Sequence, residues 1–301
     1  MAPSARRQKR GRSGGVLRKA WWAAAILFLG IAAGWWVACE RRPAPPGETP
    51  TPPAVRTPPS VPPPPIRPGR LPTPAPTHPA APSVRVAIVF DDAGGALADV
   101  EEIIAIGRPV TVAVLPGLRY SAEVSQRAQA AGLEVILHLP LEPMDGTKAL
   151  GPGGVTVTMG EAEIQAAVRA GLASVPGATG VSNHMGSRAT ADRRVMRAVM
   201  EVARERDLFF LDSKTTIHSV VGSVAAEAGI RSAVRTVFLD NENDPAAIRR
   251  EIRRLIETAL RHGEAVAIAH AQRLTPRVMA EMLPEFDRAG IVLVPVSALT
   301  R

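Results

Sequence analysis

The chain of 301 residues contains a single cysteine, Cys39, and its aromatic residues amount to only 4% of the sequence. One cysteine excludes an intramolecular disulfide framework and a metal site built from several thiolates. All four tryptophans lie before residue 37, and Tyr120 is the only tyrosine. The chain beyond residue 82 therefore has few of the aromatic platforms on which sugar rings stack, which argues against a long saccharide groove.

The formal net charge of +8 is concentrated near the start of the chain. Residues 1–42 hold nine Lys or Arg and one acid, whereas residues 83–301 hold 24 basic and 26 acidic residues. The C-terminal part is slightly acidic and lacks the basic face that binding to a phosphate backbone requires, so no nucleic-acid partner is expected. Its roughly 220 residues fit one large α/β domain.

An uncharged stretch, residues 20–38, follows a basic tail (1–19) and carries the four tryptophans at its two ends. At 1.5 Å per residue it is about 28 Å long, close to the hydrocarbon thickness of a bilayer. Interfacial tryptophans and a basic flank predict a transmembrane signal-anchor, with the tail in the cytoplasm and the rest of the chain in the periplasm. A cleaved signal peptide is the alternative, and Cys39 weakly resembles a lipoprotein cleavage site.

Proline dominates the next segment, with 18 prolines in residues 43–82. Such a segment cannot bury a core, and we expect residues 39–82 to form a disordered, semi-stiff linker. At about 3 Å per residue it would reach on the order of 100 Å. The predicted architecture is a membrane anchor, a tether and a working domain over residues 83–301.

Short apolar runs alternate with amphipathic stretches throughout this domain. Predicted strands are Arg85–Phe90, Val110–Leu115, Glu134–Leu137, Gly180–Ser182, Leu208–Leu211, Thr236–Leu239, Ala265–Ala269 and Ile291–Val296. Predicted helices are Ala96–Ile106, Ser121–Ala131, Glu161–Ser174, Asp192–Arg206, Val220–Ala228, Pro245–Arg261 and Pro276–Ala289. This alternation predicts an α/β fold with a parallel sheet, and seven or eight units favour a (β/α)7-8 barrel.

Chemically active side chains follow most of the predicted strands. They are Asp91-Asp92, His138, Asn183-His184, Asp212-Ser213, Asp240-Asn241 and His270. The carboxyl ends of parallel barrel strands open on one face, where active sites are built. Helix capping alone is a poor explanation, because imidazole is a poor N-cap. The sequence therefore predicts a catalytic or metal site on this face.

Two aspartates and two or three further metal-ligating side chains predict a metal site with a proton acceptor beside it. Adjacent Asp91 and Asp92 should point to different sides, so that one ligates a metal while the other takes a proton. His138, Glu142 and His184 offer nitrogen and oxygen ligands suited to Zn²⁺. Pro140 indicates that residues 138–142 form a loop.

The remaining histidine completes a hydrolytic set. His270 could protonate a leaving amine, and a metal would polarise a carbonyl and lower the pKa of bound water. Metal-assisted hydrolysis of an amide or ester is the predicted chemistry. Asp240, Asn241 and Asp244 are interpreted as loop and cap residues.

Five segments, taken in order, resemble a known family. They are Val89–Gly94, Leu137–Pro143, Asn183–Ser187, Leu211–Ser213 and Ile268–His270. Together they resemble the divergent polysaccharide deacetylases, a distant branch of the carbohydrate deacetylases with the NodB-type barrel. The resemblance covers about residues 84–299. It implies a distorted barrel and removal of N- or O-acetyl groups from an envelope glycan.

The resemblance also implies roles for individual residues. Asp91 would be the catalytic base and His270 the acid, whereas Asp92, His138 and His184 would hold a divalent metal, expected to be zinc. Glu142 stands where the mainstream enzymes have their second histidine. The residues left as possible ligands or supporting groups are Glu142, Asn183, Asp212 and Ser213.

The sequence is compatible with three functions. The first is an anchored, metal-dependent deacetylase of an envelope glycan. The second is a non-catalytic module that binds a glycan or an envelope partner through a degenerate site, which the few aromatic residues and Glu142 favour. The third is a metal-dependent hydrolase of another amide or ester.

Overall fold

The computed structural model describes residues 83–271 and 274–301. The predicted basic tail (1–19), anchor (20–38) and tether (39–82) all lie outside these residues. Within the two described ranges, no helix combines the length and the apolar character needed to cross a membrane.

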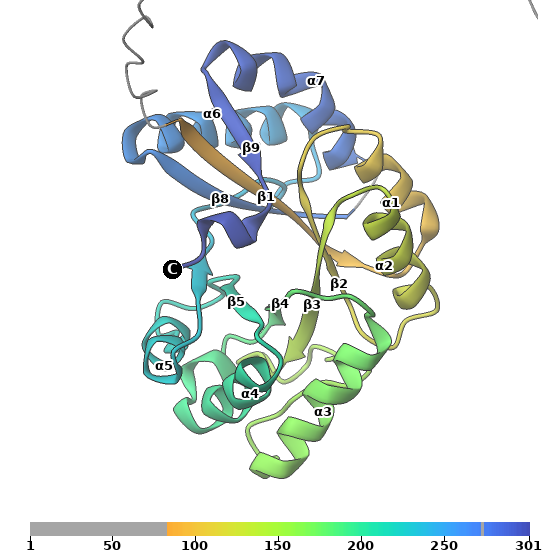
Figure 1. Cartoon of the computed structure of the whole chain (residues 1–301), viewed down its shortest axis with the longest axis vertical. Helices are drawn as coiled ribbons and strands as arrows, with labels where there is room; N and C mark the ends of the chain where they lie inside the picture. Colours follow the sequence, from red (N-terminus) through yellow and green to blue (C-terminus); the bar gives the residue numbers. More distant parts are fainter. Residues whose placement is uncertain (1–82, 272–273) are drawn as a thin grey trace, which may run out of the picture. The chain divides into compact units, whose positions relative to one another are not determined.

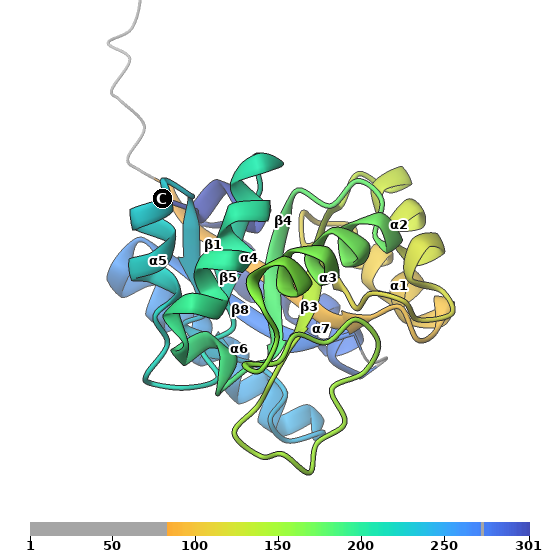
Figure 2. The ribbon, with the colours of Figure 1, turned by 90° about the horizontal axis from the view of Figure 1, so that it is seen from below.

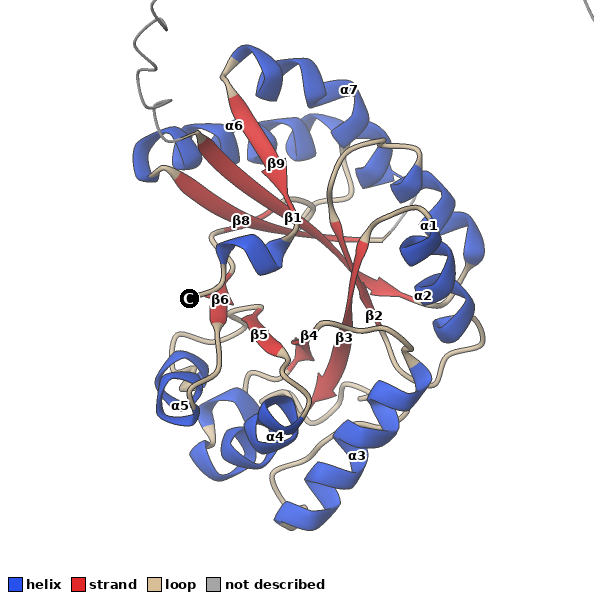
Figure 3. Ribbon diagram, viewed as in Figure 1, coloured by secondary structure: helices blue, strands red, loops and turns tan. Residues whose placement is uncertain are grey.

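A single curled sheet of parallel strands organises the domain (Figure 3). Its strands are β1 (Val84–Ala93), β2 (Thr111–Val114), β3 (Glu134–Leu141), β4 (Gly180–Met185), β5 (Phe209–Asp212), β6 (Ser232–Val234), β7 (Val237–Phe238), β8 (Glu264–His270) and β9 (Ile291–Val294). The strand order is β6-β5-β4-β3-β2-β1-β8-β7, and β9 pairs with the first half of β1. The predicted parallel α/β architecture is confirmed.

Seven α-helices of the described chain lie outside the curl (Figure 1). They are α1 (Leu97–Ile104), α2 (Ser121–Ala130), α3 (Glu161–Ser174), α4 (Arg193–Glu205), α5 (Val221–Ala228), α6 (Pro245–His262) and α7 (Leu274–Arg288). Asp192 and Asp244 cap α4 and α6 by accepting hydrogen bonds from backbone N–H groups of the first turn. Pro245 occupies the first position of α6, where its missing N–H costs nothing.

Two apolar clusters occupy the two faces of the sheet. Alternate residues of each strand point to opposite faces, so Val86 and Ile88 pack under the helices while Ala87 and Val89 face the inside of the curl. The short 3-10 helix η2 (Val296–Leu299) fills the inside at the amino ends of β2 and β3, where its first N–H groups bond to side chains of these strands. The polar site residues occupy the opposite, carboxyl end.

The sheet is a curled half-barrel, so the expected distorted (β/α)7-8 barrel is confirmed as a curled parallel sheet but does not close. In the described chain, β6 and β7 are the end strands and do not pair with each other. Only Arg235 and Thr236 separate them, and two parallel neighbours need a much longer crossover. Instead the chain switches partners here: Arg235 N donates to Asp212 O at the end of β5, and Thr236 N donates to Val266 O in β8.

The prediction of a loop at residues 138–142 is wrong, because β3 continues to Leu141. Pro140 lies opposite His184 of β4. On its other edge β3 pairs with β2 only as far as Leu137, so no β2 residue needs an N–H donor from Pro140. The chain leaves the sheet after Leu141, and the long connection to α3 stands out from the body of the domain in Figure 2.

Candidate active site

Asp91 and Asp92 form a bulge in β1. The pairing of β1 with β2 shifts register between Phe90 and Ala93, and Asp92 has the left-handed φ of 57°. A bulge breaks the alternation of side chains, so the expectation that the two carboxylates point to different sides is wrong. Both approach one imidazole: His138 Nε2 lies 3.6 Å from Asp91 Oδ2 and 3.2 Å from Asp92 Oδ1.

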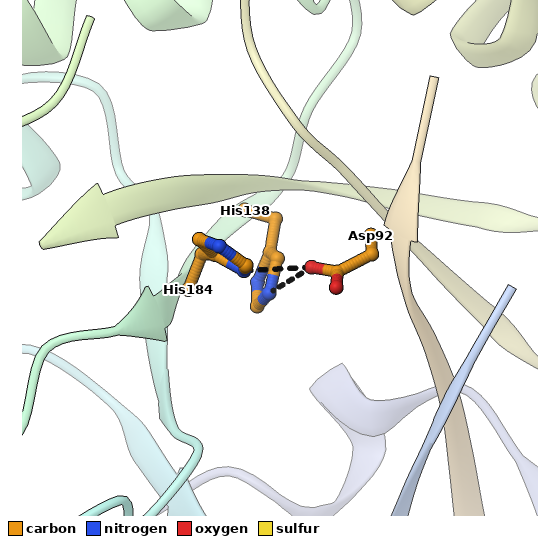
Figure 4. A group of neighbouring side chains, drawn as sticks. All are labelled: Asp92, His138 and His184. Atoms are coloured by element: carbon orange, nitrogen blue, oxygen red, sulfur yellow. Dashed lines mark ion pairs between the residues drawn. The ribbon is translucent and has the colours of Figure 1, made fainter. Parts of the chain in front are cut away.

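Strands β1, β3 and β4 bring Asp92, His138 and His184 together across the carboxyl end of the sheet (Figure 4). Asp92 Oδ1 lies 3.2 Å from His138 Nε2 and 2.7 Å from His184 Nδ1. One ligand atom from each residue lies within 4.8 Å of the other two. We call these three side chains the metal-ligand group, because one carboxylate and two imidazoles form a donor set suited to Zn²⁺ and similar ions.

The hydrogen bonding of the metal-ligand group fits a cation. Asp92 Oδ1 is buried and makes no hydrogen bond of normal geometry, although two imidazole nitrogens approach it. A buried oxygen without a partner is rare in native proteins, and a cation between the three residues would satisfy it. His138 Nδ1 lies 2.8 Å from Ser182 Oγ, and a ring that donates there presents its Nε2 lone pair to the site.

The protonation states of these residues agree with ligation. Burial lowers the pKa of His138, and the Asp92 carboxylate only partly opposes this effect, which favours the neutral imidazole. Burial alone would raise the pKa of Asp92, but the imidazoles of His138 and His184 outweigh it and lower that pKa. The group therefore offers a carboxylate and a neutral ring.

Asp91 is buried beside the metal-ligand group. Burial, followed by the neighbouring Asp92 charge, raises the pKa of Asp91 well above its usual value, and His270 partly offsets the rise. Its Oδ1 has no hydrogen-bond partner among the described residues. A carboxylate with a raised pKa is a stronger base than an ordinary one, and this suits it to accept a proton from a reacting group.

His270 lies on the other side of Asp92. Its Nε2 is 3.9 Å from Asp92 Oδ2, whereas Asp92 Oδ1 faces the two other histidines. Asp91, Asp92 and His270 also bring one ligand atom each within 4.8 Å of one another. Asp92 therefore lies between the metal-ligand group and His270, and all five predicted catalytic and metal residues meet at this end of the sheet.

Asp240 holds His270 in place, a role that was not predicted. Asp240 Oδ1 lies 3.0 Å from His270 Nδ1, and Oδ2 accepts hydrogen bonds from His270 N and Thr275 Oγ1. The hydrogen bond that His270 donates to the Asp240 carboxylate is the main reason that the pKa of His270 rises to about 9, against the effect of burial. Asp240 follows a predicted strand, as the other site residues do. Its contact with His270 depends on the pairing of β7 with β8, which the sequence does not predict.

Glu142 does not join the metal-ligand group. It lies four residues beyond His138 along an extended chain, a distance of about 13 Å. Its Oε2 accepts a hydrogen bond from Val157 N, and its Oε1 lies 2.8 Å from an Arg188 guanidinium nitrogen. In the structure Glu142 secures the β3–α3 connection.

The three other supporting candidates lie beside the site and outside the metal-ligand group. Asn183 Oδ1 accepts from Ser213 N and its amide donates to a β4 carbonyl, so it joins the ends of β4 and β5. Asp212 accepts from Lys214 N and Ser219 Oγ and shapes the turn after β5. The Ser213 hydroxyl is buried without a hydrogen-bond partner among the described residues.

A curled parallel sheet that carries acids and histidines at its carboxyl ends is the class of architecture that the sequence motifs imply. The family model for divergent polysaccharide deacetylases matches residues 88–300, and the chain belongs to this family. This confirms the resemblance found in the sequence.

Similar proteins from three bacteria extend the comparison. The chain is 37% identical over 195 residues to an uncharacterized protein of Haemophilus influenzae, covering 65% of this chain and 69% of the relative. It is 34% identical over 215 residues to the uncharacterized protein YibQ of Escherichia coli, covering 71% and 67%. The crystal structure of the uncharacterized protein ATU2773 from Agrobacterium tumefaciens superimposes with a TM-score of 0.69 at 28% identity, covering 73% of this chain and 90% of that one.

Proposed function

We propose that this protein is a metal-dependent deacetylase that hydrolyses N- or O-acetyl groups of a cell-envelope glycan. Membership of the polysaccharide deacetylase family supports the general reaction. The observation that carries the finer proposal is the convergence of Asp92, His138 and His184 next to a buried Asp91 and an Asp240-bound His270.

The residues divide the reaction between them. Asp92, His138 and His184 would hold the metal, which supplies polarisation of the acetyl carbonyl. Asp91 accepts a proton from the water whose oxygen bonds to the acetyl carbon. His270, whose pKa of about 9 keeps it protonated at neutral pH, donates its proton to the departing nitrogen or oxygen of the sugar. The bond between the acetyl carbon and that atom breaks, and acetate and the free amine or hydroxyl are released.

Two substitutions separate metal binding from proton transfer. The full-length chain, the Asp91→Asn variant and the Asp92→Ala variant are compared for bound metal, by mass spectrometry, and for acetate released from acetylated envelope glycan. Asp91→Asn should keep the metal and lose at least about 100-fold in turnover, because the base is gone. Asp92→Ala should lose both metal and turnover.

An exposed carboxylate provides the control. Asp287 forms a surface ion pair with Arg108, and Asp287→Asn should change neither quantity. Full activity of Asp91→Asn would contradict the assigned mechanism. If the wild-type protein neither binds metal nor releases acetate, the non-catalytic glycan-binding module becomes the better interpretation.

We also propose that residues 20–38 anchor the chain in the membrane, with the deacetylase domain outside the cytoplasm. The uncharged run, its terminal tryptophans and its basic flank support this location. An envelope glycan is the substrate that such a location makes accessible.

A further inference from the structure

Arg235 is a half-buried cation without a carboxylate partner. It lies at the junction of β6 and β7, where its Nε donates to Ser213 O at 2.7 Å and its Nη2 to Lys214 O at 3.1 Å. Most arginines of the domain form ion pairs on the surface, but none of the ion pairs within residues 83–271 and 274–301 includes Arg235. Burial lowers the pKa of Arg235, and the charges of Asp212 and Asp91 only partly offset this effect. A partly desolvated cation without an ion-pair partner favours the binding of an anion.

Phe238 connects Arg235 to the catalytic residues. The Arg235 guanidinium carbon lies 5.2 Å from the centre of the Phe238 ring. The same ring meets the His270 imidazole edge-on, with centroids 5.2 Å apart. Arg235 and His270 therefore lie no further apart than twice this distance. Phe238 also packs against the inner apolar cluster, which places this contact at the inside of the curl.

A surface hollow of about 340 Å³ lies beside Arg235. Its lining residues are Lys214, Thr215, Thr216, Ile217, Arg235 and Thr236. Lys214 is exposed and, among the described residues, forms no ion pair. Thr215 Oγ1 donates to the carbonyl of Met185, which follows the candidate ligand His184, so the hollow borders the active site.

Asp212 and Asp91 attract the Arg235 guanidinium, but within residues 83–271 and 274–301 neither forms an ion pair with it. Asp212 is buried, accepts hydrogen bonds from Lys214 N and Ser219 Oγ, and is not among the lining residues. Next to it, Ser213 is only 6% exposed and its hydroxyl has no partner among the described residues. Ser213 directly follows β5, and its N–H donates to Asn183 Oδ1 of β4 at the active-site end of the sheet. Two cations and an unpaired hydroxyl thus gather at one edge of the site.

We propose that Arg235 and Lys214 form an anion-binding subsite, and that the acetylated saccharide carries a carboxylate or a phosphate that binds there. This inference rests on the proposed deacetylase function. The planar guanidinium binds either anion through two hydrogen bonds, and Lys214 adds a second positive charge. The chain beyond residue 82 contains no tryptophan, so charge takes the place of ring stacking in holding the sugar.

The test compares three acetylated oligosaccharides of equal length: a neutral one, one with a carboxylate and one with a phosphate. Acetate release and calorimetric binding are measured for the full-length chain and its variants. The wild type should prefer one of the two anionic members, which identifies the anion. Arg235→Gln should raise KM for that member about 10- to 100-fold, and Lys214→Gln about 3- to 10-fold, with kcat and the neutral member changed less than about twofold.

Two further variants guard against a structural explanation. Arg235→Lys keeps the charge but loses the paired donors, so its KM for the anionic member should lie between those of the wild type and Arg235→Gln. Arg231→Gln, at the other end of β6, should have no effect. Equal losses on neutral and anionic substrates, or a wild type without preference in binding, would overturn the subsite. Absence of acetate release from all three compounds would contradict the deacetylase function instead. In that case calorimetric binding alone would decide the subsite: the wild type should still bind one anionic member more tightly than the neutral one, and Lys214→Gln should lose that preference.

Discussion

Asp240 influences the reaction through His270 without entering the metal-ligand group. Its carboxylate fixes the imidazole and its backbone N–H at once. Asp240→Asn should therefore lower kcat on the order of 100-fold, because an amide cannot orient and stabilise the protonated ring as a carboxylate does. KM and bound metal should stay within about threefold of the wild type, since substrate and metal contacts remain. Steady-state acetate release and metal analysis measure these quantities.

Asp244 offers a matched control a few residues along the same loop. Its side chain caps α6, and asparagine caps helices as well as aspartate does. Asp244→Asn should therefore leave kcat, KM and stability unchanged. A loss of metal in Asp240→Asn, or an equal loss of kcat in both variants, would show that the proposed positioning role is wrong.

Gly94 lies in the turn that directly follows the aspartate bulge of β1, and its backbone conformation favours glycine. Gly94 has a φ of 118°, and an added Cβ would lie 3.2 Å from Ser121 Oγ. Gly94→Ala should lower the free energy of unfolding by about 1–3 kcal/mol, because the side chain meets both a strained backbone and a close neighbour. Urea denaturation of the two proteins measures the difference.

The next residue serves as the control for this turn. A Cβ on Gly95 would meet no atom within 4 Å, and its φ lies outside the left-handed region. Gly95→Ala should change the stability by less than about 1 kcal/mol. If both variants unfold at the same urea concentration, the argument from backbone conformation fails.

The β3–α3 connection is the second element that affects the site. Glu142 accepts from Val157 N and pairs with Arg188, while Arg194 donates to the carbonyls of Val157 and Met159. Glu142→Ala should speed cleavage of residues 143–156 by added protease and leave bound metal unchanged. Arg188→Ala should have a smaller effect, because it removes only an exposed ion pair worth about 0–1 kcal/mol. Loss of metal in Glu142→Ala would instead make Glu142 a ligand.

Most elements could be predicted from the sequence because their apolar periodicity is strong. Helix α3 begins and ends at the predicted residues. The bounds of the other helices differ from the predicted ones by no more than two residues. Strand β6 was missed, since three residues are too few for a periodic signal. The length of β3 was underestimated because Pro140 normally ends a strand, and only the short β2 beside it explains why it does not.

The candidate site was predictable to a similar extent. Position after a strand identified Asp91, His138 and His270, since parallel strands bring their carboxyl ends together. The bulge could not be foreseen, because a left-handed φ at Asp92 has no sequence signal comparable to glycine. Contacts between distant segments, such as Asp240 with His270, depend on which short strands become neighbours.

At the scale of the molecule, charge separates the two parts of the chain. The first 42 residues carry eight net positive charges, while the domain is slightly acidic. A basic tail is attracted to the anionic cytoplasmic face of a membrane, and an acidic domain is not. High salt weakens an attraction by charge but not the insertion of an apolar segment, so the proposed anchor predicts that the full-length chain remains in the membrane fraction in high salt. A chain without residues 1–82 should be recovered in the soluble fraction.

Location and processing can be decided in the same cells. Protease added after the outer barrier is opened should digest the domain while the inner membrane is intact, as an extracytoplasmic location requires. The mass of the purified protein should include residues 1–38 if the anchor is uncleaved, and should begin at a lipid-modified Cys39 if the lipoprotein alternative holds. Protection of the domain from protease would contradict the proposed location, and with it access to an envelope glycan, while leaving the metal-ligand group and its chemistry unaffected.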